Sequence, residues 1–195
     1  MKHFPFIGML ILALAALHSP VFAEQAADPC ALSAQDLKAN LSLSFDAFDQ
    51  HGALPSSART LGERKCYGAA ARATEHYLAF KPGLSGPEIN VLTWHLGQYT
   101  ASSGDERGGA KLFLAARRSS TAPPESDGFD WNTYVLGSWA FLNKDRETLD
   151  DALARLAKGE GVRNRMNTKV LRGLSKCFDR SYLEAYHSPA CDPEP

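Results

Sequence analysis

The sequence predicts an all-α fold of about seven helices, arranged as stacked antiparallel pairs with a capping helix at the carboxyl end. Two observations predict this fold. Apolar residues recur at spacings of three and four along most of the chain, and no stretch of convincing length alternates in the manner of a strand. In addition, the segment 93–99 reappears at 133–139, an offset of 40 residues. Such a period is typical of stacked helical hairpins.

Composition places the chain among ordinary globular proteins and argues against several kinds of partner. The chain has 195 residues, 44% of them hydrophobic, and its 21 Lys and Arg nearly balance its 22 Asp and Glu. The resulting net charge of -1 gives no general attraction to nucleic acid or to an anionic membrane. Because no convincing local basic patch is present either, we expect no nucleic-acid partner.

Residues 1–23 have the pattern of a secretory signal peptide. A short positive start precedes an apolar run over 6–17, and Val21 and Ala23 occupy the two positions that signal peptidase reads. An uncleaved membrane anchor is the alternative, but the run is well short of the roughly 20 residues that span a bilayer. We therefore expect a single mature domain over 24–195, periplasmic or secreted, with no integral membrane segment.

The four cysteines lie in the expected mature chain and predict two disulfides, because disulfides persist in an oxidising compartment. Two cysteines are early and two are late, which favours the pairs Cys30–Cys66 and Cys177–Cys191 among three possible connectivities. A metal site made by Cys177, His187 and Cys191 is the competing interpretation. The usual zinc-ligand spacings are absent, so we expect neither a metal nor a cofactor.

The first pair of helices is expected over about 33–80. Ser33 followed by Asp36 is typical of a helix start, and the apolar spacing continues from there to about His51. A second apolar pattern runs to Phe80, where a Pro-Gly sequence follows and stops it.

The second pair is expected over about 86–118. Ser85, with Pro87 just inside the helix and Glu88 three residues on, is the strongest capping signal in the chain. A polar, glycine-containing turn at 102–105 separates the two helices of this pair.

The third pair is expected over about 130–158, with Asp130 as its cap and Gly159 near its end. A capping helix over about 168–186 follows, because apolar residues again share one face. Prolines mark a nonhelical tail over 187–195.

The repeated segments resemble a known family. Leu96-Gly97, followed by Gly109, Phe113 and Ala116, resembles the tetratricopeptide repeat signature, and Leu136-Gly137 with Leu149, Leu153 and Leu156 is a looser match. The period of 40 departs from the usual value of about 34, and large leucines stand where small residues are usual, so an irregular helical bundle is the alternative arrangement. The resemblance implies that the first helix of each pair lines a concave surface. The side chains that it would turn toward this groove are Trp94, Gln98, Trp131, Tyr134 and Ser138.

Aromatic side chains with polar neighbours are typical of protein-binding surfaces, although each of these residues is also a plausible core residue.

The motifs of common hydrolases and nucleotide-binding enzymes are absent. The leading hypothesis is therefore an exported, non-catalytic adaptor or scaffold that binds another protein or peptide. One alternative is an immunity or inhibitor protein directed at an exported toxin or hydrolase. Another is a cell-wall hydrolase with a single catalytic carboxylate, for which Glu63 or Glu88 is a candidate, although Glu88 is better explained as a capping residue.

Overall fold

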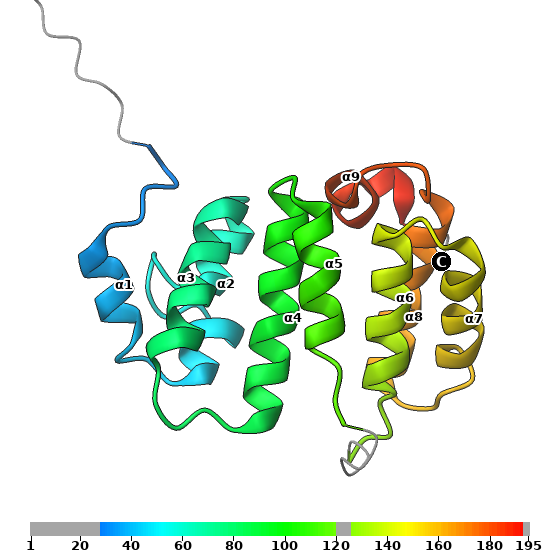
Figure 1. Ribbon diagram of the computed structural model, residues 1–195, viewed down its shortest axis with the longest axis horizontal. Coiled ribbons are helices and arrows are strands. Elements are labelled where there is room, and N and C mark those ends of the chain that lie inside the picture. Colours follow the sequence, from blue (N-terminus) through cyan, green and yellow to red (C-terminus); the bar gives the residue numbers. More distant parts are fainter. Residues whose placement is uncertain (1–27, 120–125, 193–195) are drawn as a thin grey trace, which may run out of the picture.

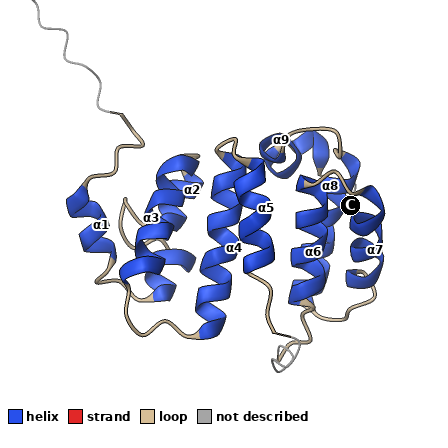
Figure 2. Ribbon diagram, in the orientation of Figure 1, coloured by secondary structure: helices blue, strands red, loops and turns tan. Residues whose placement is uncertain are grey.

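The computed structural model describes residues 28–119 and 126–192 of the chain. Within these ranges the structure contains helices and loops and no strand, which confirms the predicted all-α class (Figure 2). The expected signal peptide lies outside the described residues. The α-helices are α1 (Ala34–Asn40), α2 (Ala58–Glu63), α3 (Tyr67–Phe80), α4 (Gly86–Ser102), α5 (Glu106–Ala115), α6 (Trp131–Leu142), α7 (Arg146–Leu156), α8 (Val162–Lys176) and α9 (Tyr182–His187). A π-helix, η1 (Asp46–Gln50), and a 3-10 helix, η2 (Pro189–Cys191), complete the set.

The helices stand side by side in one row, from α1 at one end to α7 and α8 at the other (Figure 1). The core has two parts that meet at α4. The amino-terminal part is built around Phe48, Tyr77 and Leu92, and the carboxyl-terminal part around Trp94 and Phe113. Neighbouring residues of α4 therefore belong to both parts, which makes this helix the central element of the array.

Three helical hairpins, α2/α3, α4/α5 and α6/α7, share the same turn. In each turn a residue with positive φ donates its backbone N–H to the carbonyl three residues earlier, and the next residue donates to the carbonyl five residues earlier. These residue pairs are Lys65-Cys66, Gly104-Asp105 and Lys144-Asp145. The second and third turns are 40 residues apart, as the internal repeat predicts, and Asp105 and Asp145 each cap the helix that follows.

The first predicted pair of helices, over 33–80, is more broken than its apolar spacing indicates. The expected first helix ends at Asn40, where the backbone N–H groups of residues 41–43 turn to carbonyls three residues earlier. The buried Asn40 amide donates to the carbonyl oxygen of Ser56 at 2.8 Å and so fixes this end against the loop before α2. The expected second helix is divided into α2 and α3 at Lys65, whose φ of 61° is incompatible with a right-handed helix.

The expected capping helix over 168–186 is also wrong in its bounds. Helix α8 begins earlier, at Val162, and ends at Lys176; α9 then starts from a capping box at Ser181. Lys144 holds the segment between α8 and α9 in place. Its ammonium donates to the carbonyl oxygens of Phe178 and Arg180, both at 2.9 Å. A side chain from another hairpin can in this way satisfy carbonyls that are left without a helical partner where a helix ends.

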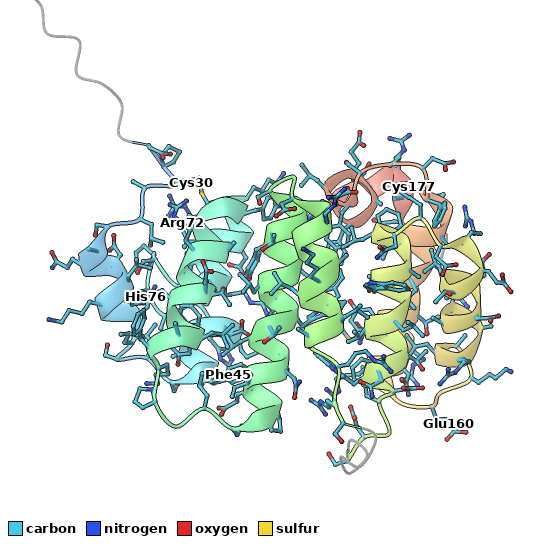
Figure 3. The ribbon with its side chains drawn as sticks, viewed as in Figure 1. Cys30, Phe45, Arg72, His76, Glu160 and Cys177 are labelled. Atoms are coloured by element: carbon cyan, nitrogen blue, oxygen red, sulfur yellow. A yellow bond between two sulfur atoms is a disulfide. The ribbon has the colours of Figure 1, made fainter. Side chains whose placement is uncertain are left out.

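Both predicted disulfides are present, and no described cysteine is free. Cys30–Cys66 joins the segment before α1 to the start of α3, and Cys177–Cys191 joins the end of α8 to η2. The labelled Cys30 and Cys177 lie toward opposite ends of the row of helices (Figure 3). Each disulfide therefore fixes a short terminal segment to the array.

Candidate binding groove

A groove of about 630 Å³ is lined mainly by the first helices of the hairpins, α2, α4 and α6, together with α8. Helix α4 forms its floor through Val91, Trp94, Gln98 and Ser102, which share one face because they are three or four residues apart. No residue of α5 or α7 contributes to the described lining. The groove therefore lies on the face that the repeat resemblance assigns to binding.

One end of the groove is aromatic. The Trp94 ring stacks on Phe113 at a centroid distance of 4.1 Å, and it contacts Tyr134 at 4.8 Å and Trp131 at 5.9 Å. The Trp131 indole donates to the carbonyl oxygen of Ala116 at 2.8 Å. Burial raises the pKa of the Tyr134 phenol well above its ordinary value, so Tyr134 is a neutral wall of this end.

Four of the five predicted groove residues line this groove: Trp94, Gln98, Trp131 and Tyr134. The three aromatic side chains are nevertheless more than nine-tenths buried, so they belong to the core as well as to the groove. Gln98 is half-buried, and its amide donates to the Tyr182 hydroxyl at 3.4 Å.

Ser138 does not line the groove, so this part of the prediction is wrong. It is fully buried, and its hydroxyl donates to the carbonyl oxygen of Tyr134 at 3.2 Å. The physical reason is that α6 packs against α5, α7 and α8, which together cover most of its circumference. Only the edge of α6 that carries Trp131 and Tyr134 reaches the groove.

A buried carboxylate orients a histidine in the middle of the groove. Asp49 is fully buried on η1, and its two carboxylate oxygens lie 2.8 and 2.9 Å from Nδ1 of His95. The Gln50 amide donates to the same carboxylate at 2.5 Å, and Arg59 Nε donates to the Asp49 carbonyl oxygen at 3.0 Å. With Nδ1 held by Asp49, the ring edge of His95 that carries Nε2 is left for the groove.

Sequence reasoning missed this pair, because Asp49 and His95 are 46 residues apart and no motif joins them. The one available signal was an aspartate inside an otherwise apolar pattern, next to Phe48. A buried carboxylate is costly unless it is paired, so such a position points to a partner elsewhere in the fold.

The other end of the groove carries cationic and polar groups. The ring of His187, on α9, stacks on Tyr67 at 5.1 Å, and its Nε2 lies 3.4 Å from the Ser102 hydroxyl. Burial lowers the pKa of His187, and the nearby charge of Lys65 lowers it further. Lys65 also lines the groove, and Tyr186, whose ring lies 4.9 Å from that of His187, reaches Tyr134 at the aromatic end.

Two arginines lie at the aromatic end, and one of them is paired with a carboxylate. Arg163 contacts both carboxylate oxygens of Asp127, at 2.5 and 2.7 Å, and its guanidinium lies 4.8 Å from the Phe129 ring centroid. This hydrogen-bonded pair lowers the pKa of Asp127 from 3.8 to about 2. Arg118 stacks over Trp131 at 5.0 Å. Asp127 therefore offsets the charge of Arg163, whereas Arg118 places a positive charge beside Trp131.

The two candidate catalytic carboxylates differ in their surroundings. Glu88 completes a capping box with Ser85, as expected, and this hydrogen bonding lowers its pKa. Glu63 is exposed and lines the groove, and no other described residue of the lining has a carboxylate.

Within residues 28–119 and 126–192, no group of three or more His, Cys, Asp or Glu has the arrangement of a metal site. No helix in these ranges has the length and apolar character needed to cross a membrane.

Comparison with known proteins assigns no family. No protein-family model, curated protein or solved structure matches the chain.

Proposed function

We propose that this is an exported, non-catalytic helical-repeat protein of the tetratricopeptide kind that acts as an adaptor or scaffold by binding a segment of another protein in the groove. One observation carries the proposal. Trp94 and Gln98 on α4 and Trp131 and Tyr134 on α6 were selected from the sequence as groove residues, and all four line one groove.

The lining of the groove supports a peptide ligand. Its volume of about 630 Å³ lies in the range of pockets that take a drug-sized ligand, roughly 300–1,000 Å³. Its lining combines aromatic rings with separate hydrogen-bonding groups, among them Gln98, His95 and Ser102. Aromatic anchors with a few polar groups are the usual source of affinity and specificity in protein recognition.

Export is part of the proposal and is supported by the disulfides. Two disulfides with no free described cysteine suit an oxidising compartment such as the periplasm. The signal-peptide pattern of residues 1–23 points to the same compartment.

The test is a paired measurement of stability and of partner capture. Trp94→Ala, Trp131→Ala, Tyr134→Ala and Gln98→Ala are compared with Lys158→Ala, which changes an exposed residue away from the groove. Anchor residues cost about 2 kcal/mol or more of binding when truncated. At least one groove variant should lose the partner while keeping most of its stability, and Gln98→Ala is the variant least coupled to the core.

The proposal fails if every variant captures the partner normally, or if binding falls only in proportion to lost folding. Identification of the captured protein also separates the adaptor from the inhibitor or immunity protein. A captured toxin or hydrolase whose activity falls on binding would favour the second of these functions.

A cell-wall hydrolase is a second candidate because Glu63 lines the groove. It predicts that the protein releases soluble fragments from peptidoglycan and that Glu63→Gln abolishes this release. Against it, Glu63 is exposed, and no hydrogen bond to a described residue fixes the direction of its carboxylate.

A further inference from the structure

Helix α8 concentrates positive charge. Its 15 residues contain five Lys and Arg and no Asp or Glu, whereas the whole chain has 21 Lys and Arg and 22 Asp and Glu. Arg163 is bonded to Asp127 and lines the groove. The other four cations are exposed, and we call them the basic stripe: Arg165, Lys169, Arg172 and Lys176.

The helix gathers these four cations on one face. Successive residues of an α-helix differ by about 100°, so the stripe occupies an arc of about 60° and runs for about 16 Å along the axis. In the sequence its members are separated by uncharged residues. The expectation that the chain has no local basic patch is therefore wrong, because the patch forms only when α8 brings these residues onto one face.

The described residues do not cancel the charge of the stripe. None of its four members has an ion pair within the part of the chain that the structure describes. Lys176 donates to the backbone carbonyl oxygen of Asp192 at 3.0 Å, which leaves its charge in place. Asp192 also borders the stripe, and Asp150, on the α7 side of α8, lies 3.8 Å from Arg146. The stripe therefore keeps an excess of positive charge.

Two apolar side chains stand beside the stripe. Val162 and Met166 lie about one turn apart, and 62% and 61% of their surfaces are exposed. Their positions around the helix are next to that of Lys169. A helix face that joins exposed cations to apolar side chains is typical of a helix lying on an anionic bilayer. The apolar groups of such a helix enter the boundary between headgroups and acyl chains.

The stripe faces away from the groove. Arg163 and Asn167 of α8 line the groove, and they lie on nearly the opposite side of the helix from the centre of the stripe. Helix α8 also lies with α7 at one end of the row of helices (Figure 1). A ridge of exposed cations at the end of the row fits a plane of many headgroups, whereas a single acidic chain would need a groove to hold it.

We propose that the exposed face of α8 attaches this protein to an anionic lipid bilayer. Lipid phosphates contact the basic stripe, and Val162 and Met166 enter the headgroup region. The inference goes beyond the proposed function and does not depend on it, because the groove stays accessible on the other side of α8.

The test is sedimentation of the mature protein with lipid vesicles. Phosphatidylcholine vesicles that contain about 30% phosphatidylglycerol are compared with pure phosphatidylcholine vesicles at about 50 mM salt, where surface charges are weakly screened. We expect the anionic vesicles to bind at least about tenfold more tightly, and this preference should shrink as salt is added.

Arg165→Gln/Arg172→Gln tests the stripe directly. Each Lys or Arg near an anionic surface contributes about fivefold in affinity, so this double variant should bind the anionic vesicles about 25-fold more weakly. The matched control is Arg107→Gln/Lys111→Gln, which removes two exposed charges from α5. It should bind within about twofold of the wild type.

Met166→Gln tests the apolar contact, because it keeps the length of the side chain and every charge of the helix. It should weaken vesicle binding by about three- to tenfold. All the substituted residues are exposed, so each variant should keep the wild-type Tm by circular dichroism.

Three results would overturn the inference. Equal affinity for anionic and neutral vesicles, or no binding to either, would exclude attachment through headgroup charge. An equal loss of binding in the α5 control would show that total charge, and not the stripe, attracts the protein. Binding of polyglutamate or of a DNA oligonucleotide through the stripe, without binding of vesicles, would assign this face to an acidic polymer instead of a bilayer.

Discussion

The close contact between α4 and α5 depends on a glycine that faces backbone atoms. A Cβ atom added at Gly109 would lie 2.7 Å from Cβ of Ala101, 2.9 Å from the carbonyl oxygen of Gly97 and 3.2 Å from the backbone nitrogen of Ala101. None of these atoms belongs to a side chain that can rotate away. Gly109→Ala should therefore push the two helices apart, although it adds only one methyl group.

The magnitude follows from two opposing effects. Alanine in place of glycine in a helix interior stabilises the helix by about 0.8–1 kcal/mol. Overpacking a well-packed core costs about 1–3 kcal/mol, and rigid neighbours place this site toward the upper end. The net loss should be about 1–2 kcal/mol. For a chain of this size each kcal/mol corresponds to about 2–4 °C in Tm, so the Tm should fall by roughly 2–8 °C.

The assay is thermal unfolding followed by circular dichroism, with Gly68→Ala as the matched control. A Cβ atom at Gly68 meets nothing within 4 Å, and Gly68 lies in the first turn of α3. The same substitution should leave the Tm of this control unchanged or raise it. A Gly109→Ala protein that melts at or above the wild-type temperature would refute the backbone contact between α4 and α5.

Three other predictions concern bonds that the structure makes. The double variant Cys30→Ser/Cys66→Ser should lose about 2–4 kcal/mol of unfolding free energy in urea, and alkylation of the unreduced wild type should label no thiol. The pKa of Asp127 is lowered to about 2, so its stabilising effect is present above about pH 4 and lost as the pH falls toward 2. Asp127→Asn should accordingly melt below the wild type at pH 6 and match it near pH 2. Asp49→Ala removes the acceptor of a partly buried imidazole and should cost about 2–4 kcal/mol, so a Tm within 1 °C of the wild type would contradict this pairing.

The elements that the sequence predicted well depend on local interactions. The capping box of Ser85 and Glu88 and the cap at Asp130 involve residues three positions apart, so their hydrogen bonds can be read from spacing alone. The all-α class follows from apolar periodicity, which is also local. The disulfide pairs followed from the clustering of cysteines at the two ends of the chain.

Within the described residues, the breaks in the helices required tertiary structure. The Asn40 side chain fixes the end of α1 to the carbonyl oxygen of Ser56, and Lys144 holds the segment between α8 and α9 through carbonyls more than 30 residues away. The apolar pattern continues through both breaks. It therefore predicted longer helices than the structure contains.

For the candidate groove as well, some residues could be predicted from the sequence, whereas others are brought together only by the tertiary structure. The sequence by itself selected the aromatic side chains of α4 and α6, because their spacing and the internal repeat place them on the first helices of two pairs. Only the packing of the pairs decided that Ser138 is buried, that Asp49 holds His95, and that Lys65 and His187 meet at one end. The physical reason is that a residue's position on a helix is fixed within one or two turns. Its partner on another helix depends on how closely and at what angle the helices pack.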